Sequence, residues 1–304
     1  WLSQVGTGRF VNLTPDVPPL DGPHSESLLR TFGFTGDGAE VWFGLAGSVG
    51  GRKMLSPLTG GTRRAFLGDR AAAPAWSPDG TRLVYFTDGA GDRLIAADRT
   101  GGDARDVPIT PVDMADWSGA AGGGSADGRP LPVHREGTHN HNPVWSVDGR
   151  WIYFVHGLEP SEEMDVWRVP ASGGVPERLT SAHAALNFLA PVDSRTLLYV
   201  ARAGDWSGPW LWALDVERKV SRRVTVGVDH YTSVAASRDG RRIVATVANP
   251  SASLWQVPVL ARPADRAAEP YPLPMPTGRA WAPRFGGRSL FYVSARGTRD
   301  GLWR

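Results

Sequence analysis

The chain of 304 residues contains no cysteine, and its only lysines are Lys53 and Lys219. The absence of cysteine excludes disulfide bonds and zinc sites built from thiolates. It is typical of an oxidising compartment, where a free thiol is a liability, so we expect an extracytoplasmic, periplasmic location, with the cytoplasm as the alternative. No stretch approaches the roughly 18 consecutive apolar residues of a membrane-spanning helix, and we expect no membrane span within the chain.

Motifs of the common catalytic classes are also missing. A phosphate-binding loop of the form Gly-x-x-x-x-Gly-Lys-Ser/Thr does not occur, which argues against nucleotide hydrolysis and kinase chemistry within this chain. The nearest approach to the nucleophile elbow Gly-x-Ser-x-Gly surrounds Ser48, where the first glycine is replaced by Ala46. We therefore expect no catalytic residues and no cofactor here, and leave open a kinase or other catalytic domain outside this chain.

Charges of the two signs nearly balance, with 33 Lys and Arg against 31 Asp and Glu. Nucleic-acid binding needs a basic face or stripe, which this balance does not favour. Adjacent arginines such as Arg222 and Arg223 stand beside expected strands and are typical of charged edges that prevent pairing with another chain. We expect no nucleic-acid partner and a monomeric protein.

A repeated hairpin pattern dominates what the sequence does contain. An apolar segment, an Asp-Gly pair and a second apolar segment follow one another in residues 74–86, 142–154 and 234–245. Asp-Gly is typical of tight hairpin turns, because glycine has no Cβ and aspartate tolerates positive φ angles. A hairpin that recurs at long, roughly regular spacing cannot bury its apolar face alone and must stack against its copies. We therefore predict a radial all-β array with no substantial helix.

Aligned on the Asp-Gly turn, each unit contains about four strands. Residues 1–14 resemble two outer strands without inner ones, and they complement a last unit that ends without an outer strand. The chain is thus predicted to be a single domain, a six-bladed β-propeller of four-stranded blades whose ring the N-terminal strand closes. The alternative to this closure is that further blades follow Arg304. Because the sequence starts within an expected strand at Trp1, we also expect it to be part of a larger polypeptide with a signalling or DNA-binding domain before Trp1. The blades are expected at about residues 28–67, 73–110, 139–180, 184–225, 231–273 and 280–304.

Aromatic residues and one long insertion complete the pattern. Bulky rings within the repeat favour filling the wedge between sheets, so Trp76 and Trp145 are expected to be buried there. Residues 111–137 form a Gly-rich insertion before the third inner strand, and loops of this length are usually binding loops or disordered. Met114 and Trp117 offer an apolar anchor for a partner, and simple covering of the blade is the alternative.

The run Trp-Ser-Pro-Asp-Gly-x-x-Leu-x-Tyr at residues 76–85, followed by a third strand and a Gly-Gly turn, resembles the WD-like repeats of TolB-type β-propellers. The resemblance covers nearly the whole chain from about residue 28 and is strongest around Trp76 and Trp145. It implies a periplasmic binding module that recognises partner proteins in an envelope system without catalysis. Similar arrays are linked to bacterial Ser/Thr kinases and winged-helix regulators, and the stretch 139–145 is most similar to those.

Histidines gather in the segments that lead into the expected inner strands. His139 lies six residues before Trp145, and His230 lies six before Ala236, at the equivalent position. In a propeller these segments approach the mouth of the central channel, so their side chains can converge on one face. His139, His141 and His230 are also the candidates for a divalent metal, against the simpler interpretation of solvated or backbone-capping histidines. The candidate binding residues are His24, Glu26, His139, His141, His183, His230 and Trp117.

The sequence therefore favours a non-catalytic binding or sensor propeller that recognises a protein, a peptide or a small molecule at this face, as part of a larger envelope or signalling protein. The alternative is a propeller-type hydrolase of glycans or esters. Such an enzyme needs two carboxylates about 5–10 Å apart, for which Glu26 and Asp229 are the candidates.

Overall fold

The computed structural model describes residues 2–3, 10–12, 32–44, 53–68, 70–87, 93–107, 138–158, 163–203, 208–225, 230–248, 253–257, 270–273, 280–287, 289–296 and 299–304. These residues form β-strands and their connections, and none of them lies in a helix. The prediction of an all-β protein is confirmed for this part of the chain. The same part holds no helix long and apolar enough to cross a membrane.

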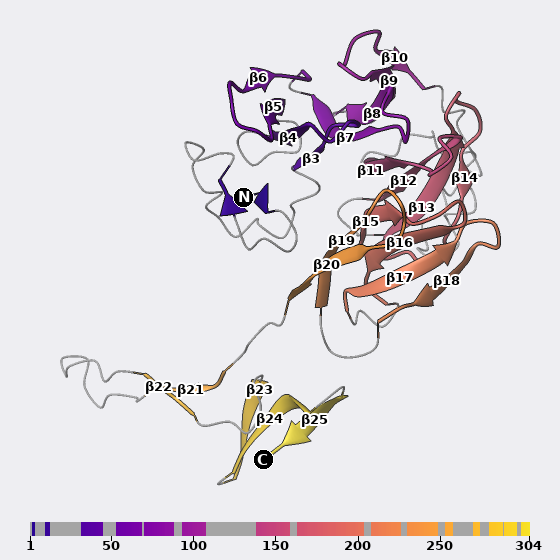
Figure 1. The fold of residues 1–304 in the computed structure, drawn as a ribbon. Coiled ribbons are helices and arrows are strands. Elements are labelled where there is room, and N and C mark those ends of the chain that lie inside the picture. The colour runs from indigo at the N-terminus through magenta and orange to yellow at the C-terminus, as the bar shows by residue number, and fades with distance from the viewer. Residues whose placement is uncertain are drawn as a thin grey trace, which may run out of the picture.

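Four antiparallel sheets of four strands each follow one another along the described chain (Figure 1). In every one of them the strands pair in chain order, as expected of propeller blades. The first sheet comprises β3 (Phe32–Phe34), β4 (Glu40–Gly44), β5 (Lys53–Pro57) and β6 (Arg64–Ala65), and the second β7 (Ala71–Trp76), β8 (Arg82–Thr87), β9 (Leu94–Asp98) and β10 (Arg105–Asp106). The third comprises β11 (Thr138–Trp145), β12 (Trp151–Leu158), β13 (Glu163–Pro170) and β14 (Glu177–Arg178), and the fourth β15 (Leu186–Pro191), β16 (Thr196–Ala201), β17 (Trp210–Asp215) and β18 (Val220–Arg223).

The remaining strands form smaller sheets. They are β1 (Leu2–Ser3) with β2 (Phe10–Val11), β19 (His230–Ala236) with β20 (Ile243–Ala248), β21 (Trp255–Gln256) with β22 (Tyr271–Pro272), and β23 (Ala280–Gly286) with β24 (Ser289–Arg296) and β25 (Arg299–Trp303). In the described chain β2 pairs with β1, and β25 pairs with β24. The number of blades and closure by the N-terminal strand stay predictions.

The innermost strand of each sheet contacts the innermost strand of the next. This series runs through β3, β7, β11, β15 and β19, and the sheets follow an arc, whereas β21 to β25 lie away from it (Figure 1). All innermost strands therefore begin on a common side of their blades. We call this side, where the chain runs into each innermost strand, the leading face.

The predicted Asp-Gly hairpins are confirmed, but the aspartate acts differently from the expectation. Of the two turn residues the glycine alone has a positive φ, 73° at Gly80. Asp79 instead accepts hydrogen bonds from Ser77 Oγ at 2.5 Å and from the Thr81 N–H at 3.0 Å. These hydrogen bonds, led by that from Ser77, lower the pKa of Asp79 to about 2. Asp37, Asp148 and Asp239 make the same pair of contacts in their turns.

The two wedge tryptophans differ in burial. Trp145 is buried between the second and third sheets, as predicted: its Nε1–H donates to the Ala75 carbonyl at 3.1 Å, and Arg82 covers its ring at 4.8 Å. Trp76 stacks on Phe66 beside the first sheet but is only half-buried, so the prediction that it is buried between sheets is wrong for this residue. In the first sheet Glu40 occupies the position that Arg82 has in the second. A negatively charged carboxylate is not attracted to the face of an aromatic ring, so Glu40 does not cover Trp76 as Arg82 covers Trp145.

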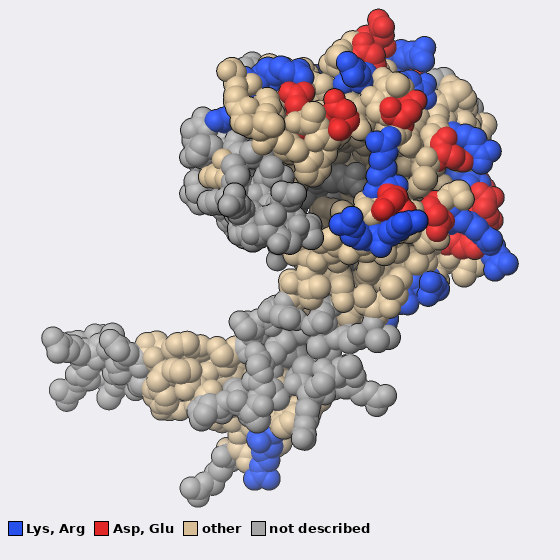
Figure 2. All heavy atoms as spheres, in the orientation of Figure 1, with Lys and Arg blue, Asp and Glu red and all other residues tan. Residues whose placement is uncertain are grey.

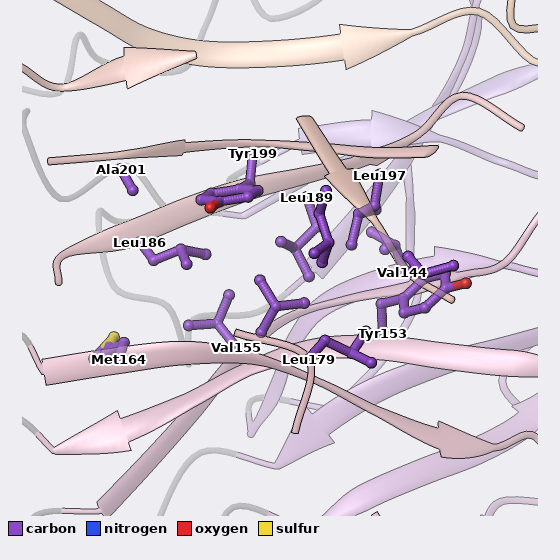
Figure 3. Close-up of a cluster of buried hydrophobic side chains, with 13 residues drawn as sticks. Val144, Tyr153, Val155, Met164, Leu179, Leu186, Leu189, Leu197, Tyr199 and Ala201 are labelled. Atoms are coloured by element: carbon purple, nitrogen blue, oxygen red, sulfur yellow. The ribbon is translucent and has the colours of Figure 1, made fainter. Parts of the chain in front are cut away.

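The largest buried cluster lies between the third and fourth sheets (Figure 3). Leu189, Leu197 and Leu214 from the fourth sheet are fully buried in it, together with Val155 and Val166 from the third. Burial of one such side chain stabilises the fold by roughly 1.5–3 kcal/mol, so this cluster holds the two blades in a fixed relation.

Charges of both signs are interspersed over the visible face of the blades (Figure 2). Arg168 on β13 joins the third sheet to the fourth: its Nε donates to Glu177 at 2.6 Å and its Nη1 to Glu217 at 3.1 Å. Its guanidinium also lies 4.3 Å from the ring centroid of Trp151. Because Arg168 is buried and satisfied on both sides, it fixes the contact between these two blades.

Candidate functional site

A β-bulge interrupts the innermost strands near the leading face. Ladder pairing skips two residues in β7, β11, β15 and β23. The first skipped residue has a positive φ in each strand: 48° at Ala73, 53° at Asn142, 57° at Phe188 and 52° at Ala282. Residues with a Cβ adopt this conformation only at a cost, and bulges often re-aim side chains next to functional sites. The bulges in these four strands therefore mark the segments that are candidates for a binding site.

Two asparagines meet where β11 and β15 lie side by side. Asn142 Nδ2 lies 3.5 Å from Asn187 Oδ1, at the outer limit of a hydrogen bond. Asn142 is completely buried, whereas Asn187 is half-buried. Among the described residues, Asn142 Oδ1 has no hydrogen-bond partner. A buried acceptor left unsatisfied costs roughly 1–3 kcal/mol, so this oxygen can gain from a donor that the described residues do not supply.

His141, the neighbour of Asn142, joins the same two strands. Its ring is buried, and its Nε2–H donates to the Leu186 carbonyl at 3.2 Å. The contact bridges residues 45 apart in the sequence and links one blade to the next. His141 therefore contributes to the site first by holding β11 against β15.

His183 belongs to a polar cluster that fixes the crossover from β14 to β15. At its centre Asp165 is fully buried and accepts hydrogen bonds from Thr180 Oγ1, the Ala182 N–H and Arg178 Nη2, each at 2.6 Å. Arg178 Nη2 also donates to His183 Nε2 at 3.0 Å. The cluster gives both oxygens of the Asp165 carboxylate a hydrogen-bond donor and places His183 beside the leading face of the third blade.

The positions of Asp165 and Arg178 carry different chemistry in other blades. Arg93 and Asp106 occupy them in the second sheet, with the charges exchanged and 2.9 Å between them. In the fourth sheet they are Trp210 and Arg223, whose guanidinium lies 4.9 Å from the ring centroid. His230, at the start of β19, meets the Trp210 ring edge-on at 6.4 Å. The second, third and fourth sheets therefore each have an attractive pair at this position, of a different type in each.

The predicted site residues are only partly placed. His24, Glu26 and Trp117 lie outside the described residues, as do Asp229 and the insertion 111–137. The backbone of His139 pairs with Gly157 at the start of β11, and its side chain is outside the described part. No group of three or more His, Asp or Glu among the described side chains lies close enough to hold a metal ion. The proposed binding role of the histidines stays a prediction.

Sequence reasoning missed the asparagine pair and the Asp165 cluster. One signal was present: Asn142 precedes Pro143, just as Ala73 precedes Pro74 at the same position of the preceding blade. The bulge position is apolar in the second blade and polar in the third, and this change indicates that Asn142 has a role of its own. No comparable signal identifies Asn187, because its partner lies on another blade.

No family model matches the chain. Among curated proteins, an uncharacterised protein of Agrobacterium fabrum is 31% identical over 129 residues, which cover 42% of this chain and 35% of that protein. The match thus spans about a third of the length of the curated relative.

Among solved structures, a TolB candidate of Agrobacterium tumefaciens matches with a TM-score of 0.49 and 24% identity, over 71% of this chain and 73% of that one. The structure is similar to TolB-type β-propeller proteins. TolB of Acinetobacter baumannii matches with a TM-score of 0.48 and 16% identity, over 71% of this chain and 47% of that one. At these identities the likeness concerns the fold, and a fold does not determine what is bound.

Proposed function

We propose that this chain is a non-catalytic binding or sensor module that recognises a protein or peptide at the leading face of its innermost strands. The observation that supports this most directly is the pair Asn142 and Asn187. A carboxamide offers one acceptor and two donors, which complements the N–H and C=O of a peptide group. Asn142 Oδ1 is buried and lacks a partner among the described residues, and a ligand would reach the pair through Asn187, the half-buried member.

The hydrogen bonds of the Asp165 carboxylate, which lies near the leading face, support binding rather than catalysis. Asp165 is fully buried and accepts three hydrogen bonds within its own blade and crossover, which favours a structural role over that of a general base exposed to a substrate. The pair required by the hydrolase alternative, Glu26 and Asp229, lies outside the described residues. The lack of cysteine supports an extracytoplasmic location within an envelope or signalling assembly.

In this proposal six blades form a ring that the N-terminal strands close. Phe34 in β3 and Phe285 in β23 occupy the position that Trp145 holds in β11. Phe285 lies three residues after the start of its bulge, as Trp145 does, and Phe34 lies directly before its hairpin turn, as Trp145 does. Trp145 packs against the preceding blade, whereas both phenylalanines are exposed. Aromatic rings at this position are suited to a preceding blade, and in the proposed ring the sixth blade precedes Phe34 and the fifth precedes Phe285.

A capture experiment with a matched pair of variants tests the binding role. The immobilised chain is exposed to periplasmic and to cytosolic extracts, and retained proteins are identified by mass spectrometry. Asn142→Gly removes the amide while suiting the positive φ, and Ala73→Gly makes the same backbone change at the equivalent bulge without removing an amide.

We expect specific capture from the periplasmic extract. The affinity for the captured protein falls about tenfold or more in Asn142→Gly, since a lost hydrogen bond to a buried acceptor costs roughly 1–3 kcal/mol. Ala73→Gly keeps the native affinity. Equal binding by both variants would contradict the role of the asparagine pair, and specific capture only from cytosol would contradict the location.

A further inference from the structure

A hollow of about 220 Å³ opens on the outer half of the fourth blade, along β17 and β18 (Figure 1). Its lining combines apolar and charged side chains and includes Thr196, Ala213, Asp215, Arg218, Val220 and Arg222. Thr196 pairs with Asp215, and Ala213 pairs with Arg222, so these four side chains share one face of the sheet. Thr196 begins β16, directly after the hairpin turn that follows β15. The hollow therefore lies at the end of the blade opposite to the leading face.

The third blade fills the equivalent space with its own side chains. Arg168 lies over Trp151, with the guanidinium 4.3 Å from the ring centroid. Its Nε donates to Glu177 at 2.6 Å, and the arginine itself is buried. An arginine on β13 and a carboxylate on β14 thus neutralise each other there, beside a large aromatic ring.

The fourth blade carries different residues at all three positions. Thr196 takes the place of the tryptophan, Ala213 that of the arginine and Arg222 that of the glutamate, as the matching strand pairs of the two sheets define. Two large side chains thus become small ones, which accounts for the hollow, and a carboxylate becomes a guanidinium. Among the described residues, the Arg222 side chain has no ion-pair partner. This part of the chain therefore supplies no carboxylate to the cation at this position.

Asp215, the acid in this lining, is already neutralised. Its carboxylate accepts hydrogen bonds from Arg195 Nη2 at 2.8 Å and from the N–H groups of Glu217 at 3.2 Å and Arg218 at 3.0 Å. The hydrogen bond from Arg195 is the largest cause that lowers the pKa of Asp215, so the carboxylate is ionised and paired at neutral pH. Arg218, whose side chain is 75% exposed, and Arg222 leave the hollow with a surplus of positive charge. This surplus favours an anion over a cation.

We propose that this hollow binds a small carboxylate that carries a short apolar group. Arg222 pairs with the carboxylate, since a guanidinium matches the two oxygens of a carboxylate in a bidentate contact, and Arg218 adds a second positive charge. Ala213 and Val220 provide an apolar wall for the rest of the ligand. The volume of about 220 Å³ is below the roughly 300–1,000 Å³ of sites for drug-sized ligands, so the ligand is small.

Titration of the protein with butyrate at constant ionic strength tests the ligand class, with the arginine Nε–H signals followed by nuclear magnetic resonance. We expect saturable binding at one site, weaker binding of acetate because it lacks the apolar group, and no binding of butylammonium, which has the same tail and the opposite charge. Inorganic phosphate that binds as tightly as butyrate would overturn the carboxylate assignment. Absence of saturable butyrate binding would overturn the site.

Two neighbouring arginines provide a matched pair of variants. Arg222→Gln removes the proposed partner, and Arg223→Gln makes the same change of charge on the opposite face of β18, where Arg223 lies 4.9 Å from the Trp210 ring centroid. We expect Arg222→Gln to lower the affinity for butyrate about tenfold or more, the effect of losing charge-assisted hydrogen bonds, and Arg223→Gln to keep the native affinity. Equal losses in both variants would show a nonspecific effect of charge and overturn the site.

Thr196→Trp tests the hollow itself, because it restores the aromatic residue of the third blade without changing any charge. We expect this variant to lose butyrate binding while both arginines remain, with circular dichroism as the check of folding. Native affinity in folded Thr196→Trp would overturn the assignment of the ligand to this hollow.

Discussion

Replacing Asp165 with asparagine tests whether the crossover between the third and fourth blades depends on a buried charge. The carboxylate is fully buried and accepts three hydrogen bonds of 2.6 Å. Asparagine keeps the volume and one acceptor oxygen, but it turns an amide N–H toward one of the donors and removes the charge opposite Arg178. Hydrogen bonds to charged groups are worth about 1.5–3 kcal/mol each, and breaking a buried pair costs about 3–5 kcal/mol.

The expected loss lies below that upper range, because Arg178 is not left without partners. Its side chain is 21% exposed and keeps the hydrogen bond from its Nε to the Thr180 carbonyl. We therefore expect Asp165→Asn to lower the free energy of unfolding by about 2–3 kcal/mol.

Asp106→Asn is the matched control, since Arg93 and Asp106 occupy the same two positions in the second blade. Their side chains are 65% and 53% exposed, and exposed ion pairs contribute about 0–1 kcal/mol. The chemical change is identical and only the burial differs, so the difference between the variants measures the effect of burial. Added salt is expected to screen the Asp106 pair and to leave the Asp165 pair nearly unchanged.

Urea unfolding followed by tryptophan fluorescence measures both variants, with the free energy obtained by linear extrapolation. The reasoning is refuted if Asp106→Asn is as destabilising as Asp165→Asn. It is equally refuted if Asp165→Asn costs less than about 0.5 kcal/mol, the level of an ordinary surface substitution.

Two further predictions concern the turns and the ring. The pKa of Asp79 in the folded protein is about 2, below its ordinary value of 3.8, so its contribution to stability is complete above about pH 4 and is lost as the pH falls toward 2. Asp79→Asn should therefore flatten the dependence of the unfolding free energy on pH over that interval, measured by denaturant titrations. An unchanged slope would contradict this role of Asp79. Deletion of residues 1–14 should lower the melting temperature and promote aggregation if the N-terminal strands close the ring, whereas unchanged melting and light scattering would exclude that role.

The hairpins of this protein could be predicted from the sequence because their determinants are local. Ser77 and Asp79 close their turn through contacts two residues apart, and Gly80 supplies the positive φ. The apolar segments on either side of each turn then specify antiparallel pairing in chain order. Even here the sequence indicated the turn without showing that the aspartate acts through its side chain.

Contacts between blades were decided by the tertiary structure alone. Asn142 meets Asn187, and His141 meets the Leu186 carbonyl, only because β11 and β15 lie side by side with a particular stagger. Trp76 and Trp145 occupy the same position of the repeat and yet differ in burial, because the preceding blade offers each a different neighbour. A local pattern determines which strands form, but the stagger between sheets depends on the packing of all their side chains together, and no single segment of sequence carries that information.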